Sequence, residues 1–149
     1  MRGRGAWTVG PLAALPGQGE LVWHGGDRIY RVRRGKLESA GPSAIDRVVY
    51  PGRPPVLAPW KEPVPVKDSP AAEIFGWLKT WNFGRKVLDP VLVLGWIGAA
   101  LLGGALPWRP YIFLVGDRGV GKTTLQNLVR AVLGDTLLRT ADATAPGIR

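Results

Sequence analysis

The pattern of hydrophobic and polar positions divides the chain into three parts. Residues 1–50 hold short apolar runs separated by glycine-rich turns, a pattern typical of β-strands. Two of these runs, Leu21-Val22-Trp23 and Ile29-Tyr30-Arg31-Val32, flank the turn Gly25-Gly26-Asp27 and therefore predict a β-hairpin. We expect a small β-rich module over residues 1–50.

A proline-rich segment follows over residues 51–69. It runs from Pro51-Gly52-Arg53-Pro54-Pro55 to Pro63-Val64-Pro65. Proline has no N–H group to donate, so this stretch cannot hold a regular ladder. We interpret it as an extended linker or as an arm that wraps over the neighbouring structure.

Helical spacing begins at about residue 70. Ser69 and Pro70 fit an N-cap and a first helical position. The apolar residues that then recur at helical spacing are Ile74, Trp77, Leu78 and Trp81. The uncharged stretch 91–106 predicts a second helix, whose glycines favour close packing against a sheet. An alternative is a membrane anchor, although the stretch is shorter than the roughly 20 residues that a bilayer requires.

The last third changes from a strand pattern to a helix pattern. Residues 111–115 are an unbroken apolar run, typical of a strand buried on both faces of a parallel sheet. Beyond them, Leu125, Leu128, Val129, Val132 and Leu133 lie on one helical stripe, and Gly134 is a helix stop. This order predicts an α/β fold, a P-loop NTPase with a partial, truncated parallel sheet. We assign residues 70–149 to a helical segment and the N-terminal part of that domain.

Residues 116–123 connect the two patterns and read Gly-Asp-Arg-Gly-Val-Gly-Lys-Thr, a full match to the phosphate-binding loop G-x-x-x-x-G-K-[ST]. Glycines allow backbone N–H groups to converge on phosphate oxygens, and a helix N-terminus favours an anion. We expect Lys122 to contact the β- and γ-phosphates of ATP and Thr123 to ligate Mg²⁺. The predicted nucleotide-binding residues are Gly116, Asp117, Arg118, Gly119, Val120, Gly121, Lys122, Thr123 and Thr124.

Hydrolysis requires an acidic residue at the end of a second strand, the Walker-B position. Residues 136–140 are a candidate strand and Asp142 follows them, but only two apolar residues lie just upstream and no second acidic residue is adjacent. A βαβ unit also takes about 30 residues. We therefore expect the chain to stop inside its nucleotide-binding domain and, alone, to hydrolyse ATP poorly or not at all. No catalytic residue is assigned.

Residues 106–124, which begin Leu-Pro-Trp-Arg-Pro, and residues 139–149, with Ala-Asp-Ala-Thr and Gly-Ile-Arg, resemble the ATPase segment of helicase-primase-like proteins from bacteriophages and prophages. The resemblance implies an AAA+-type domain that assembles into a homo-oligomeric ring and couples ATP hydrolysis to DNA strand separation in replication. It carries over the binding positions Gly116, Gly119, Gly121, Lys122, Thr123 and Thr124. The Walker-B, sensor and arginine-finger regions of that family have no counterpart in the chain.

The net charge of +9 and the pI near 10.7 favour a polyanionic partner, DNA first. The candidate contacts on the predicted hairpin are Arg28, Arg31, Arg33, Arg34 and Lys36; a solvated strand face is the alternative. The absence of Cys excludes a disulfide framework and thiolate metal sites. The N-terminus has no apolar signal segment, so we expect a cytoplasmic protein without a membrane partner.

Two further residue types have both a structural and a functional interpretation. His24 lies near Asp27, but we expect a structural histidine because no nucleophile or metal partner accompanies it. We expect Trp77, Trp81, Trp96 and Trp108 to pack in the core rather than to stack on bases. The favoured function is the ATP-binding portion of a phage or mobile-element DNA helicase-primase. The alternatives are a membrane-associated NTPase anchored by residues 91–106 and a non-hydrolysing nucleotide-binding remnant.

Overall fold

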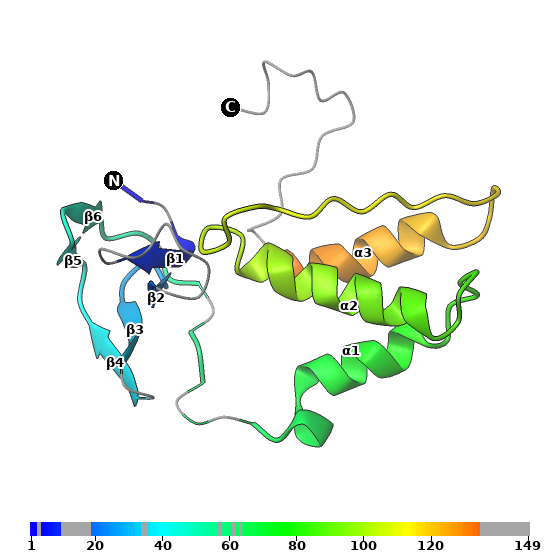
Figure 1. Cartoon of the computed structure of the whole chain (residues 1–149), viewed down its shortest axis with the longest axis horizontal. Coiled ribbons are helices and arrows are strands. Elements are labelled where there is room, and N and C mark those ends of the chain that lie inside the picture. The colour runs from blue at the N-terminus through cyan, green and yellow to red at the C-terminus, as the bar shows by residue number, and fades with distance from the viewer. Residues whose placement is uncertain are drawn as a thin grey trace, which may run out of the picture. The chain divides into compact units, whose positions relative to one another are not determined.

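The computed structural model describes residues 1–2, 4–9, 19–33, 36–56, 58–60, 62 and 64–134, and only the backbone of Arg33. The chain divides into two compact units, Met1–Phe113 and Leu114–Arg149. Figure 1 labels their helices and strands. Several sequence predictions fall on residues that the structure does not describe. These are the candidate strand 136–140, Asp142, the resemblance over residues 139–149 and the candidate DNA contact Arg34.

The first unit begins with a four-stranded antiparallel sheet in chain order, β1 (Gly5–Val9), β2 (Glu20–His24), β3 (Ile29–Arg33) and β4 (Lys36–Ala40). Strands β2 and β3 pair Val22 with Arg31 and Trp23 with Tyr30, which confirms the predicted hairpin. Strands β5 (Ser43–Ile45) and β6 (Val48–Tyr50) form a separate hairpin (Figure 1). The apolar core of this module consists of Val9, Val22, Ile29, Ile45 and Tyr50.

Two tight turns shape the module. The turn between β5 and β6 has positive φ at both Asp46 (47°) and Arg47 (64°), as a two-residue type I′ hairpin requires. Between β2 and β3, Gly26 has φ +99°, and a Cβ there would overlap the carbonyl oxygen of Pro54. The N–H of Arg53 donates to the carbonyl of Gly26 at 3.0 Å, so the start of the proline-rich segment lies directly on this turn.

A 3₁₀ helix, η1 (Val66–Asp68), precedes α1 (Pro70–Leu78). The Ser69 hydroxyl oxygen accepts a hydrogen bond from the N–H of Ala72 at 3.3 Å, and Pro70 is the first helical residue, which confirms the predicted N-cap. The helix brings Leu78 to a fully buried position. The helix ends at Leu78, so Trp81, which the helical spacing includes, lies beyond its C-terminus.

Helix α2 (Leu88–Leu101) contacts α1 and buries Pro90, Val93 and Ile97 on one face. The predicted second helix is thus present, beginning a turn earlier and ending earlier than residues 91–106. The two glycines inside α2 do not mark close packing against a sheet, because a Cβ added at Gly95 or Gly98 would meet no atom within 4 Å; of the glycines in the predicted stretch, Gly104 does approach β1 closely.

The turn after α2 packs on β1 within the same unit. A Cβ at Gly104 would overlap the carbonyl oxygen of Ala6 and lie 3.0 Å from the Trp7 ring. The Thr8 hydroxyl donates to the carbonyl of Ala105 at 2.9 Å. On Trp7, the guanidinium carbon of Arg2 lies 4.8 Å from the ring centroid. The β-rich module and the helical segment therefore make direct contact.

The second unit contains α3 (Lys122–Leu133), which ends at Gly134 and confirms the predicted amphipathic helix. Leu125, Val129 and Leu133 are its buried residues. These side chains belong to the apolar stripe that the sequence predicts, and this stripe is the buried face of the helix.

The predicted parallel sheet is wrong. In the described part of the chain, the sheets are the antiparallel four-stranded sheet and the β5–β6 hairpin, and no parallel sheet is present. Residues 111–115 are not a strand, and Tyr111, Phe113 and Val115 are 88%, 87% and 93% exposed. A strand requires a neighbour to satisfy its N–H and C=O groups and to cover its side chains. No described residue pairs with this segment, so its apolar composition alone does not make it a sheet strand.

Candidate functional site

The predicted phosphate-binding loop is a tight turn between residues 111–115 and α3. Gly119 and Gly121 both have φ +87°, in the left-handed region. A side chain is disfavoured in that region by roughly 1–2 kcal/mol, because its Cβ approaches the next carbonyl oxygen. Two of the three motif glycines therefore hold backbone conformations that glycine adopts readily.

The loop leads directly into a helix N-terminus. Gly121 is the N-cap, with ψ 16°, and its carbonyl accepts the N–H of Leu125 at 2.9 Å. The N–H groups that precede Leu125 in α3 have no acceptor four residues earlier within the helix. Together with the positive end of the helix dipole, they make this turn favourable for an anion.

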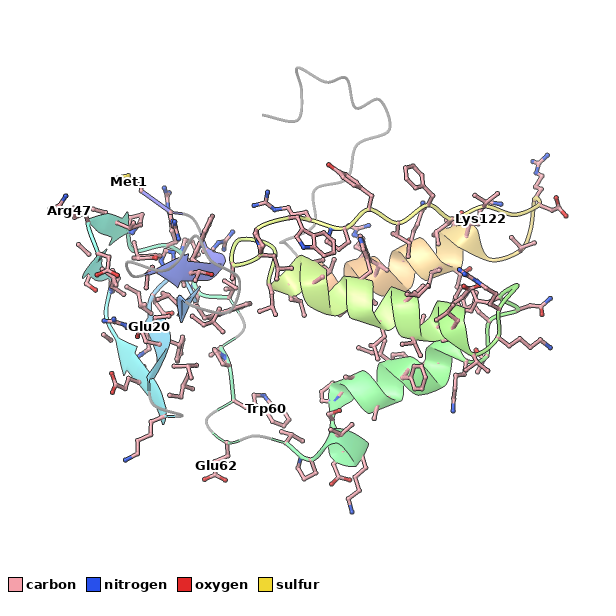
Figure 2. All side chains as sticks on the ribbon, in the orientation of Figure 1. Met1, Glu20, Arg47, Trp60, Glu62 and Lys122 are labelled. Atoms are coloured by element: carbon pink, nitrogen blue, oxygen red, sulfur yellow. The ribbon has the colours of Figure 1, made fainter. Side chains whose placement is uncertain are left out.

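Lys122 closes the loop on itself. Its ammonium nitrogen donates to the carbonyl oxygens of Gly116 at 2.7 Å and Asp117 at 2.6 Å. Figure 2 labels Lys122 at the start of α3. An ammonium group has three donors, so two point at the loop backbone and a third N–H is left for another acceptor. The Lys122 ammonium group is thereby fixed beside the first residues of the loop by hydrogen bonds to their backbone.

The remaining motif residues lie around this turn. Asp117, Arg118 and Val120 are exposed, and a Cβ added at Gly116 would lie 3.0 Å from a methyl carbon of Val120. Thr123 and Thr124 are exposed in the first turn of α3. Among the residues described, no group of three or more His, Asp or Glu side chains could hold a metal ion.

Among the described members of the predicted DNA-binding set, Arg28 precedes β3, Arg31 and Arg33 lie on β3, and Lys36 begins β4. The guanidinium of Arg31 donates to both carboxylate oxygens of Glu20, at 2.9 and 2.7 Å, and this contact raises the pKa of Arg31. Glu38 lies opposite Arg31 in the register. Arg28 and Lys36 are exposed, whereas the side chain of Arg33 lies outside the description. The surface around Arg31 therefore carries charges of both signs.

The prediction of a structural role agrees with the structure for His24, but the prediction of core packing fails for two of the tryptophans. His24 is fully buried, and its ring meets Tyr50 edge-on with centroids 5.5 Å apart, as a structural histidine requires. Trp96 donates from its indole nitrogen to the carbonyl of Pro110 at 3.0 Å. The core prediction is wrong for Trp77 and Trp108, which are 47% and 68% exposed.

Sequence reasoning missed the partners of Lys122, because they are carbonyl oxygens that every residue type carries. It also missed the exposure of half of α2, because an uncharged stretch gives no sign of which face is covered. No helix within the described ranges has both the length and the apolar character to cross a membrane.

Comparison of the chain with protein-family models, curated proteins and solved structures finds no match. The resemblance to helicase-primase proteins accordingly stays a prediction. The site itself is defined by the local geometry of residues 116–124.

Proposed function

We propose that residues 116–124 bind the triphosphate of ATP or a related nucleoside triphosphate together with Mg²⁺. The observation that carries this proposal is the pair of left-handed glycines, Gly119 and Gly121, placed directly before α3 with the Lys122 ammonium across the turn. Backbone N–H groups, a helix dipole and one cation then act on the same small volume. Each of them favours a phosphate group.

The residues of the loop have separate roles in this proposal. Lys122 exchanges the neutral carbonyls of Gly116 and Asp117 for the charged β- and γ-phosphate oxygens. A phosphate oxygen carries a full negative charge and a carbonyl oxygen only a partial one, so the ammonium group gains Coulomb attraction in this exchange, which favours the bound state. The Thr123 hydroxyl ligates Mg²⁺, and Thr124 contacts an inner phosphate.

For the wider role, we propose that the chain supplies the ATP-binding loop of an ATP-dependent DNA helicase-primase of phage or mobile-element type. The support is the sequence resemblance over residues 106–124. DNA and further copies of the protein, arranged in a ring, are the partners of this proposal. Of the predicted DNA-binding set, Arg28 and Lys36 are exposed, and Arg31 pairs with Glu20.

The proposal on the loop is tested by calorimetric titration of the 149-residue chain with ATP and Mg²⁺. Lys122→Ala should weaken binding about 10- to 100-fold, because a hydrogen bond to a charged group contributes about 1.5–3 kcal/mol. Lys67→Ala removes an exposed lysine of η1 and should leave the affinity unchanged. Inorganic tripolyphosphate should compete with ATP. Equal affinities of the wild type and Lys122→Ala would refute the role of Lys122.

A further inference from the structure

Helix α2 has a second apolar face, opposite the one that buries Pro90, Val93 and Ile97. On a helix of 3.6 residues per turn, this outer face of α2 consists of Leu88, Val91, Leu92, Gly95, Gly98, Ala99 and the C-cap Leu102. Its large side chains are between 40% and 50% exposed. The outer face contains no polar side chain over its whole length.

This composition is unusual for a helix in contact with water. Such a helix normally places charged and polar residues on its exposed side, and one that is apolar all round is normally covered. Scattered exposed leucines require no explanation, but a continuous apolar face marks an interaction surface. The outer face of α2 is continuous along the helix, so it indicates a partner.

The charged residues that flank the outer face in the sequence, Arg85, Lys86, Asp89 and Arg109, are positive in sum. Between residues 90 and 116 the sequence has no Asp or Glu, and Arg109 is the one charged residue. The Nε atom of Arg109 lies 3.7 Å from an ideal Cβ on Gly103, just beyond the end of the face, and the adjacent Trp108 is 68% exposed. At the other end, Lys86 is exposed, while Arg85 pairs with Asp89 at 2.7 Å. A partner with negative charge along the edges of an apolar surface complements this arrangement.

Two partners could cover the outer face of α2, a second copy of the chain or a lipid surface, and the area of the face distinguishes between them. Fourteen helical residues measure about 21 Å, and one side of a helix of about 10 Å diameter offers roughly 300–400 Å². A stable protein interface buries about 800 Å² on each partner. The outer face alone is too small for such a dimer. A bilayer has no such minimum, because burial of apolar side chains and attraction of cations to anionic headgroups add independently.

We propose that the outer face of α2 rests on the surface of a membrane that contains anionic lipid. The helix lies in the plane of the interface, with Leu88, Val91 and Leu92 directed at the acyl chains. Lys86 and Arg109 reach lipid phosphates at the two ends, and Trp108 lies at headgroup depth. This inference is independent of nucleotide binding by residues 116–124.

Co-sedimentation of the 149-residue chain with vesicles tests the proposal. One vesicle preparation is pure phosphatidylcholine, and the other contains about one quarter phosphatidylglycerol. The chain should pellet with the anionic vesicles, and added salt should release it. Val91→Glu places an acidic group in the face and should lower the partition coefficient about tenfold or more. Lys86→Gln and Arg109→Gln should each lower it about fivefold.

Val66→Glu is the matched control, because Val66 is an exposed valine outside α2. It should leave vesicle binding unchanged, and circular dichroism should show the same helix content in both glutamate variants. Equal pelleting with both lipid compositions, or equal binding by wild type and Val91→Glu, would overturn the proposal. So would sedimentation velocity without vesicles that shows a dimer dissociated by Val91→Glu, since a second copy would then cover the face.

Discussion

The ammonium nitrogen of Lys122 lies 2.7 Å from the carbonyl oxygen of Gly116, six residues earlier in the chain. This contact joins the entry of the loop to the first residue of α3 and holds the backbone closed around the motif glycines. A loop that is ordered before its ligand arrives loses less conformational entropy on binding. In our account, the lysine therefore both shapes the turn and contacts the phosphates.

Gly119→Ala tests whether left-handed backbone is required in the loop. A Cβ at Gly119 would meet no atom within 4 Å, so the strain at φ +87° is the whole cost of the change. That strain of roughly 1–2 kcal/mol should weaken ATP binding about 5- to 30-fold as the loop relaxes. Gly84→Ala, at a glycine with open space and no positive φ, is the control for fluorescence titration with a labelled ATP analogue. Unchanged affinity of Gly119→Ala would exclude a structural need for this glycine.

Gly26→Ala tests the packing of the proline-rich segment on the β2–β3 turn. The added methyl group would overlap the carbonyl oxygen of Pro54, lie 2.9 Å from that of Arg53 and strain φ +99°. Overpacking and strain together should lower the free energy of unfolding by about 2–4 kcal/mol, measured by urea denaturation. Gly41→Ala adds a methyl group in open space and should change it little. A loss below about 0.5 kcal/mol in Gly26→Ala would mean that residues 53 and 54 move away freely.

The sequence predicts local structure well where a short pattern determines it. The turn between Trp23 and Ile29, the N-cap at Ser69 and the helix after Lys122 each depend on residues close in the chain. Periodicity and capping act within a few residues, so one sequence contains the required information. The motif glycines at 119 and 121 belong to the same class, because positive φ is a local demand.

The sequence fails where a partner far along the chain decides the outcome. Residues 111–115 have the composition of a buried strand, but burial depends on neighbouring strands that the described chain does not provide. The ion pair between Arg31 and Glu20 likewise depends on strand pairing that the sequence alone does not show. Trp108 is a large apolar residue of the type usually found in a core, but its side chain is largely exposed. The type of a side chain indicates which surroundings it favours, but its actual burial and contacts depend on the fold.

Tyr50→Phe tests the effect of a buried phenol on the pH dependence of stability. Burial raises the pKa of Tyr50 above its ordinary value, against the charge of Arg2 and a hydrogen-bond interaction with Arg2, which both lower it. The unfolded chain ionises this group near pH 10 while the folded chain keeps it protonated. The contribution of the protonated Tyr50 to the free energy of unfolding is therefore fully present below pH 10, and it is lost as the pH rises through the folded-state pKa.

In Tyr50→Phe, the free energy of unfolding should fall less steeply above about pH 10 than in the wild type. At neutral pH the free energy of unfolding should change by about 1 kcal/mol or less, since a typical hydrogen bond contributes no more than that. Tyr111→Phe, at a largely exposed tyrosine, is the control. Identical alkaline slopes of Tyr50→Phe and the wild type, measured by urea denaturation across the pH range, would contradict this assignment.

The most direct test of the central claim is a nitrogen–proton correlation spectrum of the chain during titration with ATP and Mg²⁺. Amide hydrogens that donate to phosphate oxygens change their chemical shifts strongly. We predict saturable downfield shifts at Gly119, Gly121, Lys122 and Thr123, much weaker ones in Lys122→Ala, and little change in β1–β4. Shifts concentrated in the β-sheet, or an unchanged loop at saturating ATP, would contradict nucleotide binding by residues 116–124.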